Sequence, residues 1–244
     1  MFPVLQIGPL SIQTPNLVIL LGLWLGLTLA ERLAPRFGVD GDTLYNLSFI
    51  AIIAGIIGAR LSFAAQSLQN FLDKPLSLLS PTPNMLDPVG GMLIALTASL
   101  IYGSRKKLAL WPTLDALTPL LATLGIALGL AHLASGDAFG MPAELLWGIS
   151  LWGARRHPSQ IYEIVASGLT LWLIWPRANS ARGMAGETFG RFTALSAGAC
   201  LFLHGFRGDS TILANGFRLE QIIAWGVLAV SLWWLGKFYK KIEG

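Results

Sequence analysis

Seven long runs of apolar residues, separated by short polar stretches, account for most of this 244-residue chain. Each run approaches the roughly 20 residues that an α-helix needs to cross the hydrocarbon core of a bilayer. The pattern therefore predicts an all-α membrane protein, in which seven transmembrane helices form one integral membrane domain over residues 1–244. The predicted segments are approximately residues 16–32, 44–66, 86–103, 114–134, 159–176, 190–206 and 217–236.

Composition agrees with a membrane location. Hydrophobic residues make up 54% of the chain and charged residues 12%, whereas a typical soluble domain contains about 25% charged residues. The one cysteine, Cys200, excludes an internal disulfide and a cysteine-rich metal site. We therefore expect no metal and no other cofactor. The net charge of +4 comes from short basic clusters between apolar runs, a pattern that does not indicate a nucleic-acid partner.

Basic residues predict the orientation of the bundle, because cytoplasmic loops of membrane proteins are enriched in Lys and Arg. With the N-terminus outside the cell and the C-terminus in the cytoplasm, eleven of the 17 basic residues lie on the cytoplasmic side and five on the outer side. The cytoplasmic group is Arg32, Arg36, Arg105, Lys106, Lys107, Arg177, Arg182, Arg191, Lys237, Lys240 and Lys241. The outer group is Lys74, Arg155, Arg156, Arg207 and Arg218, and Arg60 lies within a predicted helix.

Polar residues from five predicted helices gather at the outer end of the bundle. They are Arg60, Asp87, His132, Asp137, Arg156 to Glu163, His204, Arg207 and Asp209. For Asp137, Asp209 and Arg155, the simpler interpretation is that helix ends are where polar residues belong. Arg60 interrupts an apolar run, so we expect either a functional role or a buried ion pair with Asp87 or Glu163.

The stretch from Arg156 to Glu163 carries the strongest signal, because it places polar groups at the start of an apolar helix. Pro158 is suited to a first helical turn, and the spacing puts Ser159, Gln160 and Glu163 on one face. Tyr162 lies at a depth where a phenol can contact lipid headgroups. A helix N-terminus beside arginines can bind a phosphate, and Glu163 should need an arginine partner.

Several short motifs, in order along the chain, resemble those of the prolipoprotein diacylglyceryl transferase family. They are Ile7–Ile12, Gly55–Leu61, Gly90–Leu93, His157–Glu163, Phe206–Asp209 and Leu219–Ile222. The resemblance implies a seven-helix enzyme of the bacterial inner membrane, embedded with its site at the outer face. It implies transfer of a diacylglyceryl group from phosphatidylglycerol to the lipobox cysteine in the signal peptide of an exported prolipoprotein, with release of glycerol phosphate.

The chain departs from the family signature at several positions. On the fourth helix, Gly129 stands where the family has an arginine, and His132, Ser135 and Asp137 stand where it has Asn, Asn and Glu. Val89 replaces a histidine, Cys200 and His204 replace an Arg-x-x-x-Glu pair, and Gln13 to Pro15 replace Arg-Trp-Tyr.

These departures leave two main hypotheses. In the first, the enzyme is active: His132 or His204 deprotonates the thiol, since histidine can act as a base near neutral pH, while arginines bind phosphate. The phosphate and lipid ligands would be Arg60, Arg156 and Arg207, supported by Asp137, His157, Gln160, Tyr162, Glu163, Gly90 and Gly91. In the second, the protein is inactive and binds lipid or lipoprotein. A seven-helix small-solute transporter is a distant alternative, because the sequence has no internal repeat.

Overall fold

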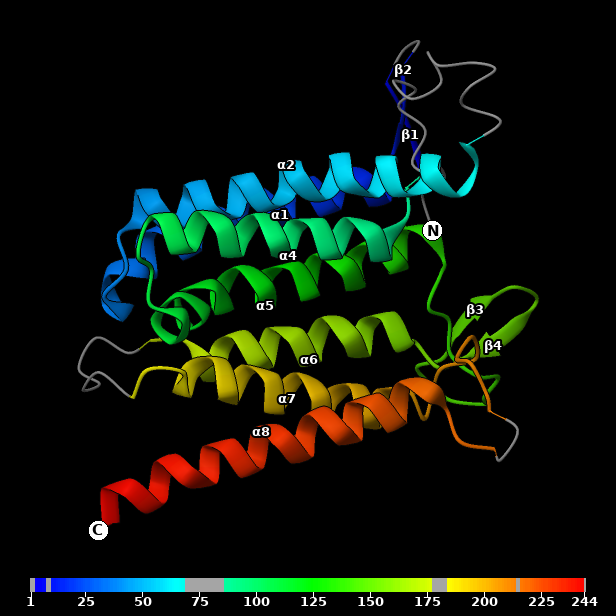
Figure 1. Ribbon diagram of the computed structural model, residues 1–244. Coiled ribbons are helices and arrows are strands. Elements are labelled where there is room, and N and C mark those ends of the chain that lie inside the picture. The colour runs from blue at the N-terminus through cyan, green and yellow to red at the C-terminus, as the bar shows by residue number, and fades with distance from the viewer. Residues whose placement is uncertain (1–2, 8–9, 69–85, 177–183, 214–215, 244) are drawn as a thin grey trace.

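The computed structural model describes residues 3–7, 10–68, 86–176, 184–213 and 216–243. In these ranges the chain forms seven α-helices that run along a common direction (Figure 1). They are α1 (Thr14–Leu33), α2 (Gly41–Gln66), α4 (Pro88–Arg105), α5 (Leu110–Ser135), α6 (Ser159–Ile174), α7 (Glu187–Leu203) and α8 (Leu219–Glu243). A 3₁₀-helix, η1 (Ala34–Phe37), follows α1. The basic residues Lys74, Arg177 and Arg182, and the Gly8-Pro9 pair of the first family motif, lie outside the described residues.

The structure adds two antiparallel hairpins that the all-α prediction missed. Strand β1 (Val4–Ile7) pairs with β2 (Leu10–Gln13), and β3 (Ile149–Leu151) pairs with β4 (Ala154–Arg156). Both hairpins lie at the end of the bundle where the chain begins, opposite the C-terminus (Figure 1). Four-residue and three-residue strands are too short to give a clear alternation of polar and apolar residues, so the sequence pattern did not reveal them.

Four of the predicted segments correspond to helices that are long and apolar enough to cross a membrane: Thr14–Phe37, Gly41–Gln66, Leu110–Ser135 and Leu219–Lys237. The other three helices, α4, α6 and α7, contain 18, 16 and 17 residues. At 1.5 Å per residue they are about 24–27 Å long, slightly less than the roughly 30 Å of a hydrocarbon core.

Small residues bring the helices close together. A Cβ atom on Gly26 of α1 would lie 2.7 Å from the Leu120 side chain of α5. A Cβ on Gly91 of α4 would lie 2.8 Å from the Gly55 carbonyl oxygen of α2, and one on Gly129 of α5 would lie 2.8 Å from Ile164 of α6. Such close contacts stabilise helix pairs in a membrane, where the hydrophobic effect between helices is absent.

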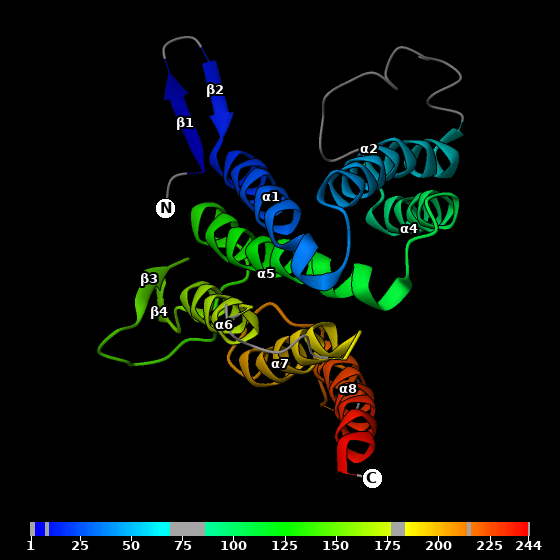
Figure 2. The same ribbon diagram turned by 90° about the vertical axis from the view of Figure 1, so that its left-hand side faces the viewer.

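The helices form three groups when viewed along their axes (Figure 2). The pair α1 and α5 is central, α2 and α4 lie to one side, and α6, α7 and α8 lie to the other. A buried cluster that includes Leu27, Leu44 and Leu120 joins α1, α2 and α5 near η1. This arrangement places α6 beside α5 and between α5 and α7.

Carboxylate side chains cap the N-termini of three helices. Asp40 accepts a hydrogen bond from the Thr43 amide (2.8 Å) at the start of α2, and Asp87 caps α4 through the amides of Val89 and Gly90. Asp115 acts across the bundle: from within α5 it accepts from the amides of Gly186 (2.6 Å) and Phe189 (2.7 Å) at the start of α7. Each carboxylate satisfies amides that a helix N-terminus leaves without a partner.

Candidate active site

Glu163, in the second turn of α6, joins two other elements. Its Oε2 atom lies 2.9 Å from Nδ1 of His132 on α5, and its Oε1 atom accepts a hydrogen bond from Nη1 of Arg207 at 2.9 Å. The Glu163 side chain is only 18% exposed. A carboxylate this buried needs charged hydrogen-bond partners, and the arginine partner expected from the sequence is present.

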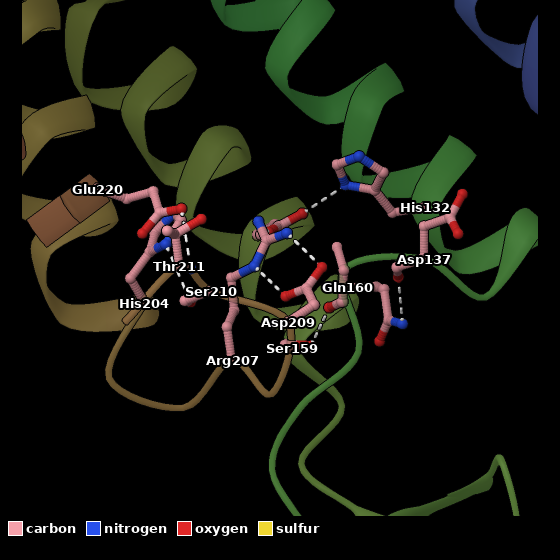
Figure 3. Close-up of polar contacts among 12 residues, drawn as sticks. His132, Asp137, Ser159, Gln160, His204, Arg207, Asp209, Ser210, Thr211 and Glu220 are labelled. Carbon is pink, nitrogen blue, oxygen red and sulfur yellow. Dashed lines mark hydrogen bonds and ion pairs between the residues drawn. The ribbon is translucent and has the colours of Figure 1, made fainter. Parts of the chain in front are cut away.

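Arg207 lies in the loop after α7 and makes a bidentate pair with Asp209. Its Nε and Nη2 atoms each lie 2.9 Å from an oxygen of Asp209 (Figure 3). Burial by itself would raise the pKa of Asp209, but the hydrogen bonds and charge of Arg207 outweigh it and lower that pKa. The Asp209 hydrogen bonds in turn raise the pKa of Arg207. The pair is therefore charged at neutral pH.

Backbone hydrogen bonds on both sides of Arg207 join its loop to the loop that follows α5. The Met141 amide donates to the Phe206 carbonyl, and the Gly208 amide donates to the Phe139 carbonyl, both at 2.8 Å. Arg218, before α8, adds a 2.6 Å hydrogen bond from Nη1 to the Arg207 carbonyl. The guanidinium thus projects from a loop that is held on both sides.

A polar cavity of about 190 Å³ opens beside Glu163, between α6 and α7. Its other polar lining residues are Ser167, Thr170, Ser196, Cys200 and His204. The two histidine candidates therefore approach Glu163 differently: His132 contacts it directly, whereas His204 shares its cavity. Nδ1 of His204 lies 3.5 Å from Ser210 Oγ, which is the limit of a hydrogen bond.

Three of the proposed supporting residues order the first turn of α6. Gln160 is fully buried and donates to the Asp137 carbonyl at 2.8 Å (Figure 3). The Tyr162 hydroxyl accepts from the Trp147 indole at 2.9 Å, and the His157 ring packs against those of Tyr162 and Phe206. Asp137 thus meets Gln160 through its backbone.

The first amides of α6 are less available to an anion than the sequence suggested. The Ser159 amide donates to the His157 carbonyl, and the amides of Ile161 and Tyr162 donate to the Pro158 carbonyl. The Ser159 hydroxyl donates to the carbonyl of Ala138. These bonds hold the helix to the preceding loop.

The three arginines proposed to bind phosphate occupy different settings. Arg156 donates to the carbonyls of Leu151 (3.0 Å) and Gly140 (3.3 Å), and it stacks on the Phe139 ring, so it fastens the β3–β4 hairpin. Arg60 lies on α2, within the α2–α4 pair. Arg207 bonds to Glu163 through Nη1.

The α2–α4 pair also contains Gly90 and Gly91, whose role in the structure is close packing. Gly91 faces Ala59 and the Gly55 carbonyl, and Gly90 faces Ser62. Asp87, one of the two expected partners of Arg60, accepts hydrogen bonds from the side chains of Ser62 (2.5 Å) and Gln66 (3.0 Å).

Sequence reasoning missed the structural roles of Arg218 and Asp115. Arg218 was counted only as an outer basic residue, although it supports the loop that carries Arg207. Asp115 lies in an apolar run of the predicted fourth segment, and its single carboxylate was a signal that could have indicated a buried cap. The direct contact between His132 and Glu163, 31 positions apart, could not be derived from spacing along one helix.

Comparison with known proteins decides the family. The sequence profile of prolipoprotein diacylglyceryl transferases matches residues 3–236. The chain belongs to the prolipoprotein diacylglyceryl transferase family.

Individual relatives agree with this family membership. A phosphatidylglycerol–prolipoprotein diacylglyceryl transferase of Synechococcus elongatus is 29% identical over 95% of this chain and 84% of its own length. The protein of that name from Bacillus cytotoxicus is 27% identical over 93% of this chain and 88% of its own length. The one from Photobacterium profundum is 31% identical over 70% of this chain and 67% of its own length.

The structure explains one departure from the family pattern. Gly129, which aligns with an arginine of the prolipoprotein diacylglyceryl transferase signature, is buried where α5 meets α6. A Cβ atom there would already lie 3.1 Å from the Ile164 amide nitrogen. A side chain at this position would require α6 to shift away from α5. Because Gly129 has no side chain, any cation in the site must come from another residue.

Proposed function

We propose that this protein transfers a diacylglyceryl group from phosphatidylglycerol to the lipobox cysteine thiol of an exported prolipoprotein. The observation that carries the proposal is the family match over residues 3–236, together with relatives that are named for this reaction. We further propose one integral membrane domain in the bacterial inner membrane. It would have seven spans, the N-terminus outside and the C-terminus in the cytoplasm, as the distribution of basic residues suggests.

The Glu163 cluster is the proposed reaction centre, with His132 as the base. Glu163 holds Nδ1 of His132 at 2.9 Å, which leaves Nε2 as the ring nitrogen that can accept a proton. The thiol needs such a base, because an ordinary cysteine is mostly protonated at neutral pH. The side chain of His132 is 33% exposed, so a substrate can reach it. His204 lines the adjacent cavity and is the second candidate.

The proposed step forms one bond and breaks one. The cysteine sulfur attacks the glycerol carbon of the diacylglyceryl group, and a carbon–sulfur bond forms as the carbon–oxygen bond to phosphate breaks. The thiol proton passes to His132, and glycerol phosphate leaves with the bonding electron pair. A guanidinium is well suited to stabilise the charge on the leaving phosphate.

Arg207 is the proposed cation for the leaving phosphate, and the carboxylates that it already binds affect how a phosphate can reach it. It serves two carboxylates, Glu163 and Asp209, which together exceed its single positive charge. A guanidinium has five N–H donors, and the three bonds to these carboxylates leave two for a phosphate. Because the two carboxylates already exceed the charge of the guanidinium, we expect a phosphate to compete with Asp209, the more exposed of the two.

The second candidate function is a family member that binds lipid or lipoprotein without catalysis. Gly129 favours it, because the arginine that the family resemblance implies at this position is absent.

One experiment separates the two candidates. Purified protein in phosphatidylglycerol liposomes is incubated with a lipobox peptide, and the peptide mass is followed by mass spectrometry. The transferase proposal predicts a gain of one diacylglyceryl group, and no gain when the peptide cysteine is replaced by serine. Binding of the peptide with no mass gain, under conditions where a known relative is active, would support the non-catalytic candidate.

A further inference from the structure

A second cavity lies between α7 and α8, near the N-terminus of α5. Its volume is about 390 Å³, and its walls include Trp111, Phe189, Val227, Val230 and Trp234. The helices α7 and α8 diverge toward the C-terminal end of α8 (Figure 1). The rings of Trp111 and Trp234 meet edge to face, with centroids 3.9 Å apart. The cavity therefore lies at the opposite end of the bundle from Glu163.

The chemistry of this cavity is that of a hydrocarbon site. Its two lining hydroxyl groups both donate hydrogen bonds within the protein: Ser231 Oγ donates to Thr193 Oγ1, and Thr193 Oγ1 donates to the Gly190 carbonyl, both at 3.0 Å. The remaining lining residues are aromatic, aliphatic or glycine. The walls therefore offer a ligand mainly apolar surface.

The cavity is open on the side where the membrane would be. Val227 and Val230 are 44% and 62% exposed, although both line it. No backbone or side chain closes the wall at Gly226: a Cβ built there would have nothing within 4 Å. A chain from the surrounding bilayer can therefore enter sideways, between α7 and α8.

A positive charge lies one helical turn beyond the cavity. Lys237 follows Trp234 by three residues on α8, which places the two on the same side of the helix. Its ammonium group lies 3.7 Å from the centroid of the neighbouring Trp233 ring, and the residue is exposed. A lipid whose chain fills the cavity would have its headgroup near this end of α8, where Lys237 favours an anionic headgroup.

We propose that this cavity binds one acyl chain of an anionic phospholipid, as a lipid site separate from the proposed reaction centre. The inference is independent of the proposed transferase activity. It commits to a lipid rather than a second copy of the chain, because the opening is lined by apolar side chains at the level of a basic helix end.

Photo-crosslinking tests this site directly. The intact protein is placed in nanodiscs that contain a phosphatidylglycerol with a diazirine in its acyl chain, and cross-linked peptides are identified by mass spectrometry. We expect label on α7 and α8 residues that line the cavity, at least fivefold above the label on the opposite, exposed face of α8 around Trp225 and Leu232. Equal labelling of both faces would mean that only bulk lipid is present, and would overturn the proposal.

Two leucine variants form a matched pair for this test. Gly226→Leu fills the cavity from a position with open space, whereas Gly236→Leu adds the same side chain to α8 at another open position outside it. Gly226→Leu should reduce the cavity label at least fivefold, and Gly236→Leu should leave it unchanged. Unchanged label in both variants would contradict the site. Should Gly226→Leu fail to fold, Gly226→Ala should still reduce the label.

Headgroup preference gives a further readout. The same diazirine chain on phosphatidylcholine should label the cavity about fivefold less, the factor expected for one lysine near an anionic headgroup. Lys237→Gln should remove most of that difference. A preference for phosphatidylcholine, or none at all in the unmodified protein, would refute the anionic ligand. Absence of lipid label at this face, together with a link between two copies formed by a bifunctional cross-linker, would identify a second copy as the occupant and overturn the proposal.

Discussion

Replacing His132 with asparagine tests the proposed base, because asparagine is the residue that the family pattern has at this position. The side-chain amide of asparagine can take the place of Nδ1 and still donate to Glu163. The 2.9 Å contact between α5 and α6 therefore has a substitute, and the protein should fold. The variant lacks Nε2, so it has no nitrogen that can accept the thiol proton.

The expected effect follows from what a general base contributes. Such groups accelerate reactions by about 10²–10⁴-fold, which corresponds to about 2.7–5.4 kcal/mol of barrier at 1.36 kcal/mol per tenfold. Glu163→Gln keeps His132 but removes a hydrogen bond to a charged group, worth about 1.5–3 kcal/mol. That variant should lose about ten- to hundredfold in kcat.

The assay is the initial rate of peptide lipidation in phosphatidylglycerol liposomes, measured over a range of peptide concentrations to separate kcat from KM. His132→Asn should lower kcat with little change in KM, because the base acts in the transition state. His204→Asn is the matched control and should retain at least about a third of the rate, since a group outside the reaction contributes less than about 0.7 kcal/mol to it. A large loss in His204→Asn with normal activity in His132→Asn would refute the assignment and identify His204 as the base.

The remaining predictions concern the Arg207 loop. Arg207→Lys replaces a fork with a point charge that cannot serve both carboxylates, so kcat/KM should fall about ten- to hundredfold, or about 1.4–2.7 kcal/mol; an unchanged value would exclude a bidentate role. The lowered pKa of Asp209 means that its contribution to stability is present above the unfolded pKa of about 3.9 and is lost as pH falls through the lower folded value. Near neutral pH, Asp209→Asn should therefore lower the free energy of unfolding by about 1 kcal/mol, the value for a partly exposed pair. The difference in stability from the unmodified protein should disappear at acid pH, and a pH-independent difference would contradict this explanation. The same variant should lower KM for phosphatidylglycerol, because Arg207 is released for phosphate, and a raised KM would show that Asp209 assists binding. Gly140→Ala would drive a Cβ into the His157 carbonyl and should cost about 1–3 kcal/mol in thermal unfolding, whereas Gly168→Ala, in open space, should cost nothing; equal melting of these two variants would argue against the close contact.

The helices were predictable because their signal is long and local. The predicted run 114–134 became Leu110–Ser135, and the run 44–66 became Gly41–Gln66. Apolar runs of this length have few alternatives to a helix, since a backbone in lipid must satisfy its own hydrogen bonds. The two hairpins were missed because short strands at a bundle end carry no comparable pattern.

The site was predictable in part. The sequence indicated that Glu163 needs an arginine, and Arg207 fills that role. It could not indicate that Asp209 shares the same guanidinium, because two neighbouring charged residues at a helix end usually face water. The sequence also could not indicate the present partners of Arg156: its position beside the motif predicts phosphate binding, which stays a prediction, and its hydrogen bonds in the structure go to backbone carbonyls.

The expected ion pair of Arg60 with Asp87 or Glu163 depends on distances between helices, which a pattern along the chain does not contain. Depth along a helix can be read from residue number, but the side of the bundle cannot. Arg60 and Glu163 were placed at similar depth, yet α2 packs with α4 on one flank, and α6 lies with α7 on the other (Figure 2). Asp87 bonds to Ser62 and Glu163 bonds to Arg207, and a functional role for Arg60 stays a prediction.

Release of glycerol phosphate tests the central claim most directly, because it distinguishes transfer from binding and from simple lipid hydrolysis. Phosphatidylglycerol labelled in its headgroup glycerol is presented in liposomes with a lipobox peptide, and released glycerol phosphate is counted against lipidated peptide. The transferase proposal predicts one glycerol phosphate for each thioether formed and no release with a serine peptide, whereas His132→Asn should slow release about 10²–10⁴-fold. Release without a cysteine acceptor, or peptide binding without any release, would contradict it.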